Sequence, residues 1–170
     1  MKKVLIVLLA VIGITLSAQA QATLHIGYGG YTQMDACDMH DGGNVNTAWG
    51  AVTGGIYFQA LPKLQLGVSY TFSSSSYKHT DDCNVYYHVI MFNGKYDYYR
   101  SSIFKMYAHV GIGADISHMT FGDYHKNKGY FAFQVSPVCA EAAIANKVSL
   151  FGELGFGAQG LLQVGFRFRL

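Results

Sequence analysis

Charged residues are scarce in this chain of 170 residues. Only 13% of them are Asp, Glu, Lys or Arg, and only two are Glu, at positions 141 and 153. Soluble proteins normally carry a surface dense in Lys and Glu, and the same two residues favour helices. The composition therefore argues against a helical protein and against an ordinary soluble exterior. No basic patch is present either, so a nucleic-acid partner is not indicated.

Long hydrophobic runs are absent after the N-terminus, which excludes a later membrane helix of the roughly 20 residues needed to span a bilayer. The N-terminus has the parts of a secretory signal peptide: a lysine pair, an apolar run over residues 4–16 and the cleavage sequence Ala-Gln-Ala at 18–20. We predict that residues 1–20 are a cleaved signal peptide and that residues 21–170 form one domain. The alternative, a short membrane anchor, is disfavoured because the apolar run is too short to span.

Aromatic residues and glycine are abundant instead. The chain has 13 Tyr, 11 Phe and 20 Gly but only two Pro, and aromatic residues favour strands. The clearest strand is the last stretch, where apolar residues alternate with polar or small ones. This period of two places the two sets on opposite faces. One face carries Leu162, Val164, Phe166, Phe168 and Leu170, and the other carries Gln163, Gly165, Arg167 and Arg169.

The same pattern along the chain predicts eight strands, at residues 23–33, 48–60, 64–73, 84–98, 103–119, 129–142, 148–156 and 161–170. Long polar connections, expected to be loops at 34–46, 74–83 and 120–128, alternate with short turns. The last connection, 157–160, is short where a long one is expected. An even strand number with such alternation is typical of transmembrane barrels whose termini share the periplasmic side. We predict an all-β fold, an eight-stranded antiparallel up-and-down transmembrane β-barrel.

The polarity of the outward-facing side chains distinguishes a membrane barrel from a soluble one. On four strands one face is almost purely apolar, while the other carries polar and charged residues and Gly. In a membrane barrel the apolar face contacts lipid, and eight strands enclose side chains but no open channel. A soluble secreted lipocalin-like barrel, with the apolar face lining a ligand cavity, is the alternative. Residues 84–98 cannot be assigned to faces, because four apolar residues are consecutive at 89–92.

The last strand also carries a sequence signal. The pattern Gln163-x-Gly165-x-x-Phe168-x-Leu170 resembles the C-terminal assembly signal of outer-membrane proteins, although that signal more often ends in Phe or Tyr. Residues 133–138 and 151–160 resemble the closing strands of small outer-membrane β-barrels, the OmpA/OmpX-like group. The resemblance implies an outer-membrane protein inserted by the barrel-assembly machinery. It implies no particular activity, since that group includes adhesins and structural proteins.

Two groups of residues are candidate structural sites. Glu153 and either Arg167 or Arg169 lie on adjacent strands and would point into the lumen. A buried carboxylate there needs a partner, so we predict an interior ion pair. Cys37 and Cys83 fall in the first two long loops, on the same side of the membrane in an oxidising compartment. A disulfide between these two cysteines is therefore a hypothesis.

The same two loops collect Asp and His side chains that could bind a divalent ion. Their spacing matches no standard zinc or calcium loop, and solvated polar loops are the simpler interpretation. We therefore predict no metal site and no cofactor. Cys139, in a predicted strand, is expected to be a small packing residue.

A catalytic site is not apparent. His109 and Asp115 are six residues apart on one strand, about 20 Å, and Ser117 and His118 point to opposite faces. The sequence therefore predicts a monomeric outer-membrane barrel with no open pore and a structural or surface-interaction role. Its partners would be outer-membrane lipid and an unknown external ligand or host surface. A lipid-modifying outer-membrane enzyme is the alternative activity.

Overall fold

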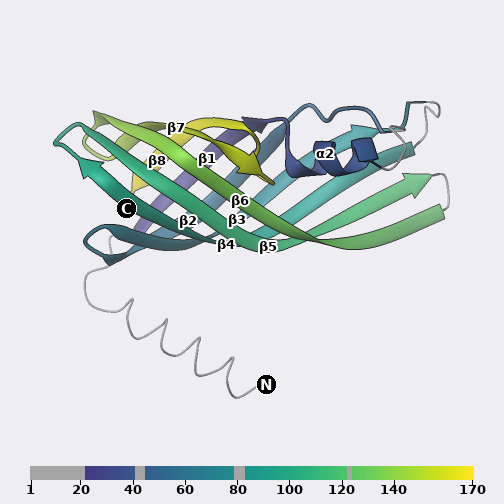
Figure 1. The fold of residues 1–170 in the computed structure, drawn as a ribbon, viewed down its shortest axis with the longest axis horizontal. Helices are drawn as coiled ribbons and strands as arrows, with labels where there is room; N and C mark the ends of the chain where they lie inside the picture. The colour runs from purple at the N-terminus through teal and green to yellow at the C-terminus, as the bar shows by residue number, and fades with distance from the viewer. Residues whose placement is uncertain (1–21, 41–44, 79–82, 122–123) are drawn as a thin grey trace, which may run out of the picture.

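The computed structural model of the chain is a closed barrel in which eight antiparallel strands pair in sequence order (Figure 1). The structure describes residues 22–40, 45–78, 83–121 and 124–170, so the predicted signal peptide lies outside the described residues. The strands are β1 (Ala22–Gly30), β2 (Ala51–Leu61), β3 (Leu64–Ser76), β4 (Cys83–Arg100), β5 (Phe104–Phe121), β6 (Tyr124–Ala145), β7 (Val148–Gly157) and β8 (Leu162–Arg169). One helix, α2 (Gln33–His40), follows β1. The predicted fold class is confirmed.

Closure of the barrel depends on β8, which pairs with both β7 and β1. Phe166 lies opposite Ile26 on β1 and opposite Leu150 on β7. We call the end with the three short connections β2–β3, β4–β5 and β6–β7 the turn end, and the opposite end the loop end. The first residue of β1 and the last residue of β8 both lie at the turn end, as Figure 1 shows for the C-terminus.

The faces of β8 are those that its alternation predicts. Leu162, Val164 and Phe166 are 46–56% exposed, whereas Gln163 and Arg167 are 1–2% exposed. The same arrangement holds on β5, where Val110 and Ile112 point outward and His109 points inward. On these strands apolar side chains therefore lie on the outside of the barrel and polar ones point into its lumen. A soluble ligand-binding barrel needs the reverse arrangement.

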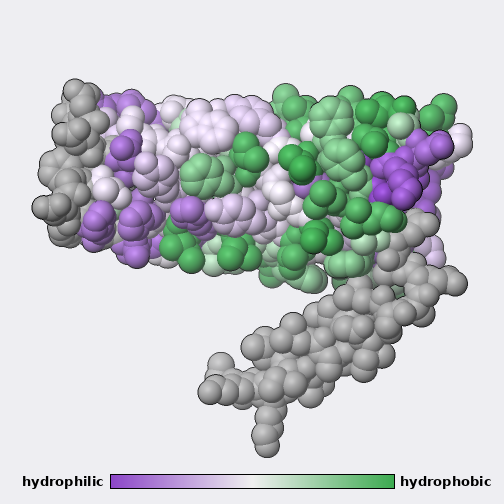
Figure 2. Space-filling model, turned by 180° about the vertical axis from the view of Figure 1, so that it is seen from behind, coloured by the Kyte–Doolittle hydropathy of each residue, from purple (hydrophilic) through white to green (hydrophobic). Residues whose placement is uncertain are grey.

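The apolar exterior forms a belt rather than covering the whole barrel. Figure 2 shows hydrophobic side chains gathered over the half nearer the turn end, with hydrophilic ones over the loop end. Aromatic side chains border the belt on both sides: Tyr28, Trp49, Tyr70 and Tyr86 toward the loop end, and Tyr96, Tyr98, Tyr99 and Phe104 toward the turn end. Such girdles mark the two interfaces of a transmembrane barrel.

The predicted loop at 120–128 is wrong. β5 continues to Phe121 and β6 begins at Tyr124, so most of this polar stretch is paired, for example Thr120 with His125. The strands project beyond the apolar belt here, and polar side chains can occupy both faces. Because no apolar face is needed, the period of two that reveals a strand is missing from the sequence. β3 likewise extends to Ser76, into the loop predicted at 74–83.

The predicted loop at 34–46 is also partly wrong, because it begins with α2. The helix is capped by a reciprocal pair: the Thr32 N–H donates to Asp35 Oδ2 at 2.7 Å, and the Asp35 N–H donates to Thr32 Oγ1 at 3.4 Å. Asp35 Oδ1 also accepts from the Ala48 N–H at 2.7 Å, which ties the helix to the chain before β2. No helix among the described residues is long and apolar enough to cross a membrane.

The interior toward the loop end contains an apolar cluster, which explains why β4 could not be assigned to faces. Val89 and Met91 point inward, while Ile90 and Phe92 point outward. Both faces of β4 are therefore apolar over residues 89–92, one toward the outside and one toward an internal cluster. The members of this cluster are Met34, Val85, Tyr87, Val89, Met91, Ala132 and Ala158.

Candidate functional site

The middle of the lumen is organised around Glu153 on β7, whose side chain is 1% exposed. Its Oε1 accepts from Lys95 Nζ at 3.0 Å and from Tyr107 Oη at 2.7 Å. Its Oε2 lies 2.6 Å from His109 Nδ1, and Arg167 Nη2 lies 3.0 Å from Oε1. These partners come from β4, β5 and β8, so one carboxylate joins walls of the barrel that are far apart in sequence.

A second buried carboxylate, Glu141 on β6, extends the network toward the turn end. It lies 3.0 Å from Lys105 Nζ and accepts a hydrogen bond from Arg167 Nη1. The Arg167 guanidinium thus bridges both carboxylates, and its Cζ lies 4.6 Å from the Tyr107 ring centroid and 4.7 Å from that of Phe151. Planar Arg suits such a place, because it can stack on rings while it donates to carboxylates.

Lys95 is held by aromatic rings as well as by Glu153. Its Nζ lies 4.1 Å from the Tyr57 ring centroid and 3.4 Å from His25 Nδ1, and the rings of His25 and Tyr57 stack with centroids 5.5 Å apart. Buried charges are tolerated only when they are paired and hydrogen-bonded. Here each buried cation has a carboxylate partner, and rings fill the remaining space.

Uncharged side chains carry the network toward the loop end. His109 Nε2 lies 3.0 Å from Asn93 Oδ1, and Asn93 Nδ2 donates to Ser69 Oγ at 2.8 Å. Gln159 Nε2, in the β7–β8 connection, donates to the same hydroxyl at 3.0 Å. Because both ring nitrogens of His109 are engaged by side chains, the histidine is a structural member of the network.

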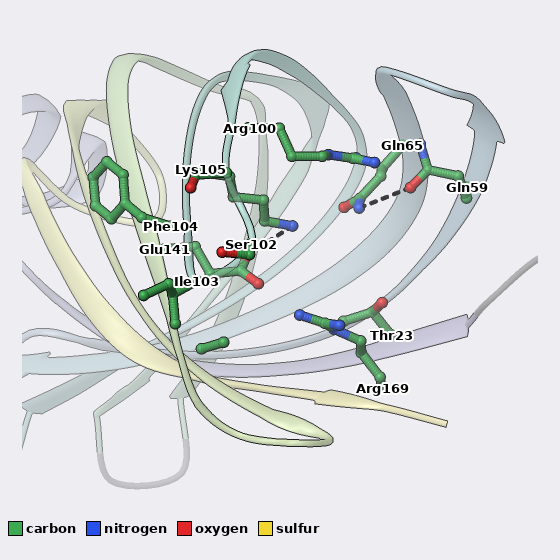
Figure 3. Close-up of a pocket in the computed structure, with 12 residues that line it drawn as sticks. Thr23, Gln59, Gln65, Arg100, Ser102, Ile103, Phe104, Lys105, Glu141 and Arg169 are labelled. Atoms are coloured by element: carbon green, nitrogen blue, oxygen red, sulfur yellow. Dashed lines mark hydrogen bonds and ion pairs between the residues drawn. The ribbon is translucent and has the colours of Figure 1, made fainter.

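Two cavities lie beyond this network, one at each end. The turn-end cavity has a volume of about 180 Å³ and is lined partly by Lys105, Glu141 and Arg169 (Figure 3). The loop-end cavity has a volume of about 230 Å³ and is lined partly by Met34 and Tyr87. The charged network and the apolar cluster occupy the space between the two.

Of the two arginines predicted as partners of Glu153, the structure pairs one with it. Arg167 contacts the carboxylate, whereas Arg169 lies one pleat nearer the turn end and lines the cavity there. Sequence reasoning missed Lys95, Tyr107 and Glu141 as members of the network. Lys95 carried a signal, because the polar residues 93, 95 and 97 recur with a period of two and all point inward. Glu141 was obscured by a register shift in β6 before Val138.

The residues of the C-terminal pattern lie on or just after β8. Gln163 faces the lumen. Phe168 is half-buried near the end of β8, and Leu170 follows β8 at the turn end and is exposed. Gly165 is required by packing alone, because a Cβ there would lie 2.1 Å from the Ile26 carbonyl oxygen on β1. The assembly role of the pattern stays a prediction.

The two cysteines predicted in loops both lie in regular elements, Cys37 on α2 and Cys83 at the first position of β4. Cys37 is exposed on α2, while the side chain of Cys83 lies outside what the structure describes, so their disulfide stays a prediction. Cys139 is buried in β6. Within the described ranges, no three His, Cys, Asp or Glu side chains are grouped so that they could hold a metal ion.

Comparison with known proteins identifies the fold. No protein-family model matches the chain, and no curated protein matches its sequence. Among solved structures, the Neisserial surface protein NspA matches with a TM-score of 0.60 at 11% identity, over 89% of this chain and 97% of that one. The chain has the fold of the small outer-membrane β-barrels.

Two further structures agree with this fold. The N-terminal β-barrel domain of Pseudomonas aeruginosa OprF has a TM-score of 0.54 at 13% identity, over 89% of this chain and 100% of that one. A de novo designed transmembrane β-barrel has a TM-score of 0.51 at 15% identity, over 90% of this chain and 98% of that one. At 11–15% identity the likeness is one of architecture.

Proposed function

We propose that this protein is an integral outer-membrane barrel with a blocked lumen, which presents an open strand edge on the cell surface as a docking site for an extended peptide segment. The turn end then faces the periplasm and the loop end faces outward. The apolar belt with its two aromatic girdles supports the membrane location. We propose no catalytic role, because His109 has both ring nitrogens engaged by Glu153 and Asn93, and His25 is fully buried beside Lys95.

The blocked lumen follows from the Glu153 network. An eight-stranded barrel has an interior just wide enough for side chains. Here Lys95, Arg167 and Glu153 meet across it, and the apolar cluster fills the space toward the loop end. Ion flow would require breaking several buried ion pairs at once. Purified protein in a planar lipid bilayer should therefore show no sustained conductance, and a steady open-channel current would contradict the proposal.

The observation that carries the surface role is the unequal length of the strands. β4, β5 and β6 have 18, 18 and 22 residues, whereas β7 and β8 have 10 and 8. A tilted strand crosses a bilayer with about 9–11 residues. The three long strands therefore project as a sheet beyond the barrel wall at the loop end, as Figure 1 shows.

The β6 edge of this projecting sheet is not covered by a neighbouring strand. β7 pairs with β6 only from Gln134 onward, so no described strand pairs with the first ten residues of β6 on that side. The side chain of Gln33 occupies the start of this edge: its Nε2 donates to Phe131 O at 2.8 Å, and its Oε1 accepts from Phe133 N at 3.1 Å. Gln33 thus makes the two bonds that a pairing strand would make.

The geometry of Gln33 also shows which backbone groups face the open edge. In an antiparallel strand the N–H and C=O of alternate residues point to the same side. The backbone groups of Phe131 and Phe133 point to the edge, so the backbone groups of His125, Asn127 and Gly129 point there too. All three of these residues are exposed. Unpaired edges of this kind are templates for strand addition, in which main-chain hydrogen bonds supply affinity.

A peptide array tests this docking role. Fluorescent proteoliposomes carrying the protein should bind a subset of strand-forming peptides. Asn127→Pro removes one edge N–H and should abolish that capture, since Pro cannot donate to an added strand. Asn127→Ala keeps the N–H and serves as the matched control, with capture unchanged. Equal capture by the Pro variant, or no peptide captured by the wild type, would contradict the proposal.

A further inference from the structure

The cavity at the turn end has the features of an anion site. It is a pocket of about 180 Å³ in the barrel mouth, and the ion pair of Lys105 and Glu141 forms part of its lining (Figure 3). Three cationic side chains reach it from the ends of three different strands: Arg100 from β4, Lys105 from β5 and Arg169 from β8. A single carboxylate, that of Glu141, lines it.

The charges in this cavity are not balanced. Glu141 is shared by Lys105 and Arg167, and Arg100 pairs with Asp97 outside the lining. Arg169 makes no side-chain hydrogen bond or ion pair with any residue in the described part of the chain. Arg169 is exposed at the cavity, so the five N–H donors of its guanidinium face water and are available to a ligand. The cavity thus contains an available cationic fork with two further cations beside it.

Neutral donors complete the lining. Thr23, Ser101 and Ser102, which carry hydroxyl groups, line the cavity, and Gln65 Nε2 donates a hydrogen bond of 3.1 Å to Gln59 Oε1, which also lines it. Hydroxyl and guanidinium donors together are the usual partners of a carboxylate or phosphate, and the fork of Arg matches two oxygens of such a group at once.

The volume limits what can enter. A cavity of about 180 Å³ has room for one small oxyanion together with some water. A ligand larger than that must place only its charged end inside. We propose that this cavity binds the carboxylate or phosphate end of a periplasmic molecule, with Arg169 as the anchor and Arg100 and Lys105 beside it. The periplasmic source rests on the orientation proposed above, whereas the anion site itself does not.

Binding of acetate and of inorganic phosphate to the detergent-solubilised protein, followed by backbone amide NMR shifts, tests the proposal and separates the two anions. Saturable shifts are expected at Ser101, Ser102 and Lys105 with at least one of them. Arg169→Gln should weaken binding about tenfold or more, because it removes a charge-assisted contact. Lys63→Gln removes one positive charge from an exposed turn at the same end, outside the cavity lining, and should leave binding unchanged.

Folding of each variant is checked by its heat-dependent gel migration, and Arg100→Gln provides a second cavity variant with a smaller expected loss. Shifts that do not saturate with either anion, or equal weakening by Lys63→Gln and Arg169→Gln, would overturn the anion site. A conducting channel in planar bilayers would overturn the blocked lumen and leave the anion site standing, so the two failures can be told apart.

Discussion

Lys95 on β4 and Glu153 on β7 form a buried ion pair of 3.0 Å across the lumen, with both side chains 1% exposed. The two residues are 58 positions apart in sequence and lie on strands that are not neighbours. The pair therefore holds the inside of the barrel together where no backbone hydrogen bond can do so.

Removing the charge of Glu153 should destabilise the barrel strongly. Glu153→Gln leaves Lys95 and Arg167 buried near an uncharged amide, and breaking a buried pair by removing one partner costs about 3–5 kcal/mol. Urea unfolding in detergent micelles, followed by the fluorescence of the single tryptophan, Trp49, measures the loss. Glu141→Gln is the matched control and should cost less, because Lys105 is 17% exposed and partly hydrated and Arg167 keeps Glu153 as its carboxylate partner. Equal losses for the two variants would contradict the central place of Glu153.

A charge on the outer face should be costly only within the apolar belt. Val110 is 55% exposed and lies midway along the membrane part of β5. Val110→Arg should lower the free energy of unfolding in lipid bilayers by about 2–4 kcal/mol, the cost of Arg at the midplane of a barrel exterior. His118→Arg, on the same face beyond the belt, should cost about 0–1 kcal/mol. A tolerated Val110→Arg would place that face in water.

The hydrogen bonds of Gln33 predict a local exchange effect. Gln33→Ala removes the acceptor of the Phe133 N–H. The exchange of this N–H with solvent should then become faster, by the factor that corresponds to the loss of one hydrogen bond worth about 0.5–1.5 kcal/mol. Gln33→Glu keeps an acceptor for this N–H and should leave its exchange slow, although it loses the donor to Phe131. Hydrogen exchange by NMR measures both. Unchanged exchange in Gln33→Ala would mean that another group protects the edge.

The Cys37–Cys83 disulfide can be tested by counting the free thiols of the unfolded protein. If Cys37 and Cys83 are bonded, protein purified without reductant and then unfolded should accept one alkyl group, on Cys139. In the folded protein Cys139 should not react, because it is buried. Mass spectrometry of the alkylated protein gives the count, and the Cys37→Ser, Cys83→Ser double variant provides the one-thiol standard. Three modified thiols in the unfolded wild type would remove the disulfide.

The sequence predicted the barrel because lipid and lumen impose opposite polarity on alternate residues. β8 shows this clearly, since Val164 and Phe166 face outward while Gln163 and Arg167 face inward. The rule failed where that constraint is missing. β4 faces an apolar cluster inside as well as the apolar belt outside, and the strand ends at 120–128 project beyond the belt, so neither shows the alternation.

The candidate site was predictable only in part, because its contacts depend on strand stagger. Glu153 and Arg167 are on adjacent strands, so a partner on β8 could be expected. Lys95 and His109 reach the same carboxylate from strands that are not its neighbours, which alternation alone cannot show. The helix α2 was missed because it is short and its sequence is polar. Its cap, Thr32 with Asp35, was the one local sign of it.

The most direct test of a lipid-facing exterior is a nitroxide scan along β8 in lipid bilayers. Single cysteines at positions 162, 163, 164, 166, 167 and 168, introduced into a variant whose three native cysteines are Ser, would be spin-labelled and their contact with dissolved oxygen measured. Position 165 is left as Gly, because a side chain there would clash with the backbone of β1. Positions 162, 164 and 166 should show high oxygen contact, as lipid-exposed sites do, and positions 163 and 167 should show little. High contact at the odd positions, or polar-reagent contact at the even ones, would mean that the apolar face of β8 does not meet lipid.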